Sequence, residues 1–430
     1  MLNWVQNLVP PNKLTGPILI SYVLFDIFLI GVTARLMGNA LVRIGQPRVV
    51  GEMMAGIMLG PTLLGQNLSE VITPMSARPI LNGIATLALI MFMFLAGIEY
   101  DVSKVKGRGV HAGLLALLSV AVPAILGFPL ANAMHNGDFA GPAGQSLLPY
   151  ALFIGAALSV TAFPVMAYIL IERGELNSPM GALGIASAGL ISVLMFTYIA
   201  FASAVASASG FGDLAINILL VIIFGVASWF IIRPLIARFF HPAIQQELIP
   251  GNALALISSG MVLFGLIAHL IGINALVGGF VWGLILPTDL KFRKAVAAKV
   301  QDIAMVFFLP IFFAMSGFST DLKLITIPHL PVVFLVLLAA IGGKFLAAIP
   351  ARALGLGWSE VGILGTLFNT RGLLVLVVGL IGLELEIITN LTFTIIVVVA
   401  LITNLMTLPL LKLISSFRNR YPSAVKEGVN

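Results

Sequence analysis

Apolar runs, most of them about 20 residues long, follow one another along the whole chain and are separated by short polar or Gly/Pro-rich turns. A run of that length crosses the hydrocarbon core of a bilayer as one helix. The runs lack the strict alternation of a membrane β-barrel. The pattern therefore predicts an all-α, polytopic membrane protein. Its thirteen predicted spans are 17–41, 50–64, 79–99, 111–134, 147–171, 180–206, 212–235, 251–270, 273–287, 296–317, 330–353, 358–382 and 387–414.

Composition supports a membrane protein and excludes most other classes. The chain is 60% hydrophobic and only 9% charged, whereas a soluble domain carries roughly 25% charged residues. Cysteine is absent and the five His show no metal-ligand spacing, so no cofactor and no resident metal site are expected. No nucleophile–base pair or phosphate loop is present, and an enzyme is not predicted. Residues 1–430 form one transmembrane domain in this interpretation, with a short cytoplasmic tail at 415–430.

Basic residues orient the predicted spans. With the N-terminus outside, most of the 23 Lys and Arg fall on the cytoplasmic side, and only Lys13, Arg78 and Lys323 fall outside. This asymmetry matches the positive-inside rule and places the C-terminus in the cytoplasm. The net charge of +6 is therefore a topology signal, and binding to nucleic acid is not expected.

Two short motifs recur at corresponding positions. Val50–Leu59 resembles Val277–Leu286, and Ala96–Asp101 resembles Ser316–Asp321. The copies are seven spans apart, so they face opposite sides of the membrane. The sequence thus predicts an inverted repeat, 17–206 and 251–414, joined by a linking helix at 212–235. Many secondary transporters are built in this way.

Breaks at matching places in two spans locate the predicted site. One span carries the sequence SVTAFP from Ser159 to Pro164, and its repeat partner carries NTRG from Asn369 to Gly372. Proline removes a helical hydrogen bond, and nearby Ser and Thr hydroxyls can satisfy the freed backbone groups. Broken helices at corresponding repeat positions mark substrate sites in transporters.

Five stretches carry a resemblance to a known family. In chain order they are GQPRVVGEMMAGIMLGPTLLG from Gly45, FMFLAGIEYD from Phe92, SVTAFPVMAYIL from Ser159, GGKFLAA from Gly342 and FNTRGLLVLVVGLIG from Phe368. The chain resembles the monovalent cation/proton antiporter-2 family, in its cation/H⁺ exchanger branch. The resemblance implies exchange of Na⁺ or K⁺ for H⁺. It also implies a moving core of spans 4–6 and 11–13 and a scaffold that forms a homodimer.

The chain departs from that family at the positions that bind the cation. Where the family carries Asn-Asp or Asp-Asp in span 6, this chain has Ile191 and Ser192. Val375 replaces an acidic residue after the second break, and Tyr168 replaces a basic one after the first. A serine hydroxyl can ligate a cation but does not titrate near neutral pH.

Lys344 in span 11 then has three interpretations. It pairs with a carboxylate elsewhere, it is itself the titrating group because burial disfavours its charged form, or it binds an anionic solute. The predicted site residues are Ser159, Thr161, Ser192, Lys344, Asn369, Thr370 and Arg371.

Four further polar residues lie within the predicted spans. Asp26 is expected to make a polar contact in the dimer scaffold, and Asn404 a buried interhelical hydrogen bond. Glu52 and Glu99 are expected to be hydrated at the membrane interface.

Three functions follow from these residues. The first is a cation/H⁺ antiporter working by alternating access. The second is a transporter of an organic or anionic solute that uses Lys344 or Arg371. The third is a non-transporting membrane scaffold or regulator.

Overall fold

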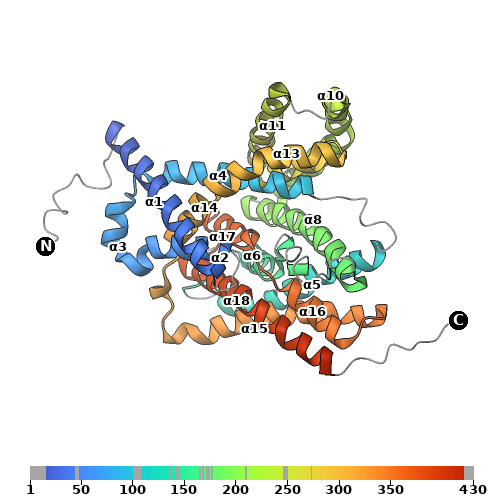
Figure 1. Cartoon of the computed structure of the whole chain (residues 1–430). Helices are drawn as coiled ribbons and strands as arrows, with labels where there is room; N and C mark the ends of the chain where they lie inside the picture. The colour runs from blue at the N-terminus through green and yellow to red at the C-terminus, as the bar shows by residue number, and fades with distance from the viewer. Residues whose placement is uncertain are drawn as a thin grey trace. The chain divides into compact units, whose positions relative to one another are not determined.

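The computed structural model describes residues 16–43, 48–99, 109–135, 138–141, 146–163, 166, 169–170, 175, 178–208, 211–245, 250–272 and 274–420. These residues are almost entirely helical and contain no strand, only an isolated bridge between Ala140 and Ile388 (Figure 1). The α-helices are α1 (Gly16–Arg43), α2 (Arg48–Leu59), α3 (Pro61–Ile72), α4 (Arg78–Glu99), α5 (Gly109–Met134), α6 (Leu147–Ser159), α8 (Pro179–Ser207), α9 (Phe211–Val226), α10 (Arg233–Gln245), α11 (Gly251–Leu270), α12 (Ala275–Ile285), α13 (Leu290–Ile303), α14 (Leu309–Phe318), α15 (Leu330–Ala348), α16 (Trp358–Phe368), α17 (Leu373–Glu384) and α18 (Asn390–Arg420). Short π-helical turns cover Ala227–Ile232 and Ala304–Phe308, and 3₁₀ turns cover Leu322–Leu324, Ile327–His329 and Ile349–Leu354.

Nine helical stretches in the described part of the chain are long and apolar enough to cross a membrane. The four remaining predicted spans are represented by shorter apolar helices, Val50–Leu59, Leu147–Ser159, Ala275–Ile285 and Leu374–Glu384. The predicted all-α, multi-pass membrane architecture is therefore confirmed. The count of thirteen crossings stays a prediction, because the shorter helices do not by themselves span a bilayer.

The chain folds into two compact units, each of which draws on both halves of the sequence. Unit 1 contains 1–101 and 203–324, and unit 2 contains 102–202 and 325–430. Unit 2 thus holds predicted spans 4, 5 and 11–13 and all but the last four residues of span 6. These are the spans that the family resemblance assigns to the core.

Glycines allow two helix pairs in unit 1 to approach closely. A Cβ added at Gly56 in α2 would lie 2.2 Å from the Phe313 carbonyl oxygen in α14. A Cβ at Gly97 in α4 would lie 2.3 Å from the Phe280 carbonyl oxygen in α12. By the recurring motifs, α12 is the repeat partner of α2, and α14 is the repeat partner of α4. The contact between α2 and α14 is therefore matched by the contact between their repeat partners, α12 and α4. Such reciprocal packing is the arrangement that an inverted repeat predicts.

Two acidic residues of unit 1, Asp26 and Glu52, are buried inside the protein. Asp26 is fully buried, and the Thr73 hydroxyl donates a 3.1 Å hydrogen bond to its Oδ1, so its polar contact lies inside the protomer. Glu52 is also buried, with 7% of its surface exposed, and the prediction of a hydrated interface residue is wrong. Packing of α2 against neighbouring helices covers it, which the local sequence does not reveal. The Glu99 side chain lies outside the described residues.

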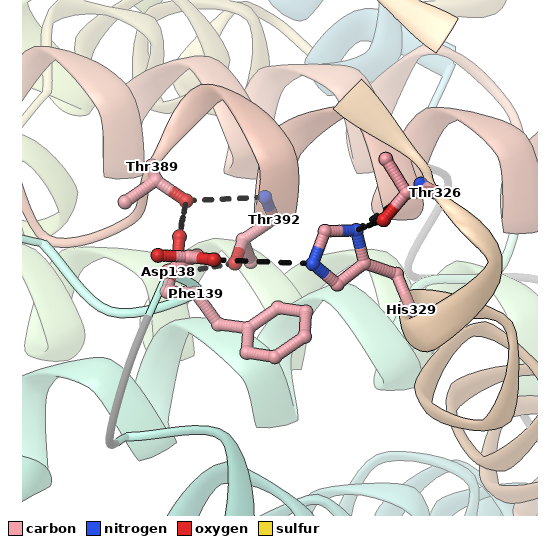
Figure 2. A network of polar contacts seen from close by, with 6 residues as sticks. All are labelled: Asp138, Phe139, Thr326, His329, Thr389 and Thr392. Atoms are coloured by element: carbon pink, nitrogen blue, oxygen red, sulfur yellow. Dashed lines mark hydrogen bonds and ion pairs between the residues drawn. The ribbon is translucent and has the colours of Figure 1, made fainter. Parts of the chain in front are cut away.

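In unit 2, a polar network ties the N-terminus of α15 to two other segments (Figure 2). The Thr389 hydroxyl donates to the Asp138 carbonyl oxygen at 2.8 Å, and the Thr392 hydroxyl donates to that of Phe139 at 2.6 Å. His329 accepts a 3.2 Å hydrogen bond at Nδ1 from the Thr326 amide, and its Nε2 lies 3.9 Å from Asp138 Oδ2. The network therefore fixes the end of the helix that carries Lys344.

The close helix crossing in unit 1 generates a stability prediction. Gly97→Ala forces a Cβ into the α12 backbone, and overpacking of this kind costs about 1–3 kcal/mol of unfolding free energy. Gly83→Ala, on an exposed turn of the same helix, meets no atom within 4 Å and serves as the matched control. Thermal unfolding in detergent should show Gly97→Ala clearly less stable than Gly83→Ala. Equal stability of the two variants would contradict the packing described.

Candidate functional site

The two breaks predicted from sequence are present in unit 2, and they bind each other. α6 ends at Ser159, after which Val160 is extended, with φ −58° and ψ 139°. α16 ends at Phe368 and α17 begins at Leu373. Across the breaks, the Ala162 amide donates to the Thr370 carbonyl oxygen at 2.8 Å, and the Thr161 hydroxyl donates to the Phe368 carbonyl oxygen at 2.7 Å. Pro164 and Tyr168 lie outside the described residues.

Ending α6 inside the protein leaves its last carbonyl groups without helical partners. The Arg371 guanidinium, which is 1% exposed, donates from Nη1 to the Ala157 carbonyl oxygen and from Nη2 to that of Leu158 at 2.9 Å. The C-terminal end of a helix carries about half a negative elementary charge, so a cation is stabilised there. The Arg371 amide donates to Asn404 Oδ1 at 2.9 Å, which confirms the predicted interhelical role of Asn404.

Lys344 brings a second basic side chain to the same end of α6. Its side chain is completely buried. The three N–H groups of a protonated Nζ are shared among four acceptors: the Ser119 carbonyl oxygen at 2.9 Å, Ser119 Oγ at 3.0 Å, Thr161 Oγ1 at 2.8 Å and the Ser159 carbonyl oxygen. All four acceptors are uncharged oxygens. For the described residues, the prediction that Lys344 pairs with a carboxylate is therefore wrong.

The local sequence explains why these oxygens are available. In a helix the Ser119 carbonyl would accept from the amide of residue 123, but that residue is Pro123 and has no N–H. The Ser159 carbonyl is the last of α6, so the break removes its helical donor. The Thr161 hydroxyl donates to the Phe368 carbonyl oxygen and still has a lone pair for Lys344. Two backbone interruptions thus create the acceptors that hold the ammonium.

Close packing of α15 against α5 brings Lys344 within reach. A Cβ added at Gly343 would lie 3.0 Å from Cα and Cγ of Pro123. Gly342 faces open space, with no atom within 4 Å of an added Cβ. Gly343 is therefore the residue that permits the approach of the two helices.

Five of the seven predicted site residues meet in this network, and Ser192 and Asn369 do not. Lys344, Thr161, Ser159, Thr370 and Arg371 are linked by the bonds described above, and Ser159 takes part through its carbonyl group. The Ser159 hydroxyl donates instead to the carbonyl oxygens of Val120 and Gly155. Ser192 lies outside the network, because its hydroxyl donates to the Ala188 carbonyl oxygen of its own helix at 3.1 Å.

Asn369 stands apart within the second break. It is fully buried, and neither polar atom of its side-chain amide has a hydrogen-bond partner in the described part of the chain. A buried amide without partners is costly, and this one is available to a ligand or a water molecule.

Sequence reasoning missed Ser119. A single serine in an apolar helix is ordinarily a packing residue, and only its spacing from Pro123 marks its carbonyl as free. Two of the departures from the family pattern are buried and apolar: Ile191 is 0% exposed and Val375 is 1% exposed. The two positions therefore add no charge to the core.

The packing of α15 generates a matched pair of variants. Gly343→Ala should displace α15 from Pro123, lengthen the bonds from Lys344 Nζ and reduce binding or transport at this site. Gly342→Ala should leave function intact, because its methyl group meets nothing. Cation-driven proton flux in liposomes measures the difference. Equal flux from the two variants, both shown to be folded, would count against this geometry.

Comparison with known proteins agrees with the architecture. A family profile described as sodium/hydrogen exchanger, transmembrane, matches residues 27–413. The chain is 36% identical over 393 residues to the Na(+)/H(+) antiporter NhaS4 of Synechocystis sp. (strain PCC 6803), which covers 90% of this chain and 96% of that protein. It is 30% identical to Cation/H(+) antiporter 19 of Arabidopsis thaliana and 29% identical to K(+)/H(+) antiporter 1 of Saccharomyces cerevisiae. These matches cover 91% and 89% of this chain but 49% and 44% of the two relatives, so the chain spans about half their length.

Among solved structures, the sodium proton antiporter MjNhaP1 from Methanocaldococcus jannaschii superposes with a TM-score of 0.67. Its sequence identity is 17%, and the match covers 95% of this chain and all of that one. The shared fold agrees with the resemblance predicted from the five motifs. The profile and the curated relatives together establish that this chain belongs to the sodium/hydrogen exchanger family.

Proposed function

We propose that this protein is a cation/H⁺ antiporter in which Lys344, in place of the carboxylate that the family resemblance leads one to expect, carries the exchanged proton. Relatives named as Na⁺/H⁺ and K⁺/H⁺ antiporters support the transport class. The observation that carries the proposal is the buried Lys344 side chain. Among the described residues its Nζ binds only uncharged oxygens, next to the contact between the two breaks.

The choice between the two buried cations follows from their chemistry. A guanidinium is not deprotonated in proteins, whereas a lysine amine can take up and release a proton. Arg371 therefore has a constant charge and holds the end of α6. Lys344 is the group in this network that can exist in two protonation states.

The same contacts weigh against an anionic solute. The Lys344 ammonium and the terminal nitrogens of Arg371 already point at carbonyl and hydroxyl oxygens, so an anion would have to displace them.

The remaining features of the proposal concern the assembly. We place unit 2, which holds the entire network, as the moving core of an alternating-access cycle, and unit 1 as the scaffold of a homodimer. The protein lies in the cell membrane with its N-terminus outside and its C-terminus in the cytoplasm, as the distribution of basic residues indicates. In this proposal the protein exchanges Na⁺ or K⁺ for H⁺ and is not an enzyme.

Reconstitution tests the proposal. Liposomes containing the wild-type protein and a pH-sensitive dye should show proton flux when a K⁺ or Na⁺ gradient is imposed. Lys344→Ala should reduce that flux to the level of empty liposomes, because no group remains to carry the proton. Lys299→Ala, at an exposed position on α13, is the control and should keep wild-type flux.

Two results would overturn the proposal. One is the absence of flux from folded wild-type protein between neutral and mildly alkaline pH, which would favour the scaffold or regulator interpretation. The other is full flux from Lys344→Ala, which would move the proton to another group.

A further inference from the structure

The Lys344 ammonium is surrounded in the way that a bound monovalent cation is surrounded. We infer that Nζ occupies the binding position of the transported cation itself, so that the lysine ammonium and the cation bind alternately in one oxygen cage. This inference rests on the proposed antiport and specifies its ligand. We define the cage as the Ser119 carbonyl oxygen, Ser119 Oγ, the Ser159 carbonyl oxygen and Thr161 Oγ1.

The cage has the chemistry of a cation site. Carbonyl and hydroxyl oxygens replace the hydration shell of K⁺ in channel filters, and neutral oxygen donors of this kind line the cage. The two carbonyl groups lack helical donors, one because of Pro123 and one because α6 ends. If Lys344 were withdrawn, these oxygens would be left buried without a donor, which is unfavourable unless another cation replaces it.

A metal ion and the ammonium cannot share the cage. Both carry one positive charge, and both require the same lone pairs of Ser119, Ser159 and Thr161. A second fixed positive charge, Arg371, lies at the same helix end and binds Ala157 and Leu158. Repulsion from this charge limits the cage to one further cation at a time, either the ammonium or the transported ion.

The dimensions of the cage favour a cation of ammonium size. Three of the four acceptor oxygens lie 2.8, 2.9 and 3.0 Å from Nζ, and the Ser159 carbonyl oxygen lies nearer. K⁺ and free ammonium have similar radii and suit such distances, whereas the smaller Na⁺ needs shorter contacts from all its ligands. The cage therefore selects K⁺ or ammonium over Na⁺.

The exchange step balances in protons and charge. The Lys344 ammonium releases one proton to water on the side to which the core is open and becomes a neutral amine. A dehydrated cation then binds the cage oxygens in its place. One positive charge leaves as H⁺ and one enters as the cation, so the charge of the core is unchanged and antiport is one-for-one and electroneutral.

Direct binding measurements test this competition without relying on transport. K⁺ affinity of the purified full-length protein is measured by thermal stabilisation in KCl, with choline chloride at equal ionic strength as the reference. In the wild type the apparent Kd for K⁺ should fall about tenfold for each unit rise in pH while Lys344 is protonated, because each K⁺ bound displaces one proton. In Lys344→Ala the Kd should be lower and independent of pH.

A second pair of variants tests the ligands and also covers the case that Lys344→Ala does not fold. Thr161→Val removes one cage oxygen and should weaken K⁺ binding about tenfold, the loss of one good ligand interaction. Thr366→Val is the control, because the Thr366 hydroxyl is also buried but donates only to the Gly362 carbonyl oxygen of its own helix. Its K⁺ affinity should match that of the wild type.

The selectivity of the cage is measured in the same way. NH₄⁺ should bind with an affinity similar to that of K⁺, and Na⁺ should bind about tenfold more weakly.

The inference fails if K⁺ affinity of the wild type does not change with pH, if Lys344→Ala retains the pH dependence, or if Thr161→Val binds K⁺ like Thr366→Val. Preference for Na⁺ over K⁺ would overturn the size argument. If K⁺ and protons compete for binding but liposomes show no flux, the proposed antiport is wrong and the shared cage stands. If liposomes show flux but K⁺ and protons do not compete for binding, the shared cage is wrong and the proposed antiport stands.

Discussion

The interrupted C-terminus of α6 is the constraint on which the core of unit 2 depends. A helix that stops inside the protein exposes carbonyl groups that must find donors where water is scarce. Arg371 takes two of them and Lys344 takes the last. Each basic residue comes from a segment distant in sequence, so the same bonds that satisfy α6 also hold α15 and the second break against it.

This solution sets the charge of the core. Two cations are stabilised by one helix end and by uncharged oxygens, without a carboxylate among their described partners. A carboxylate site binds the cation and the proton at one negative group in turn. In the proposed cycle the roles are reversed, since the proton resides on a positive group that the cation must replace. Under this proposal proton and cation still compete, although Ser192 stands where the family resemblance leads one to expect an acidic residue.

The fold and the two breaks were predictable because their signals are local. Apolar runs gave the helices, and the polar clusters around Thr161 and Thr370 gave the breaks, since such residues interrupt a membrane helix only where the protein covers them. Lys344 was conspicuous because a lone lysine in an apolar span is costly.

The rest of the site could not be read in the same way, because it depends on contacts between helices. Ser119 contributes through a carbonyl group that every residue possesses, and only Pro123 makes it special. Ser192 was placed by analogy with the family's acidic position, and its hydroxyl bonds to its own helix instead. The burial of Glu52 depends on neighbours that no local pattern specifies.

The most direct test of the account is to see what occupies the cage. Structures determined by electron cryomicroscopy with Tl⁺, a strongly scattering substitute for K⁺, should be compared at acidic and alkaline pH. The account predicts that at alkaline pH Tl⁺ density lies between Ser119, Ser159 and Thr161 and that Lys344 Nζ has left them. At acidic pH Nζ should be back in the cage and the density absent. Lys344 bound to these three residues at both pH values, with Tl⁺ bound elsewhere in the core, would contradict it.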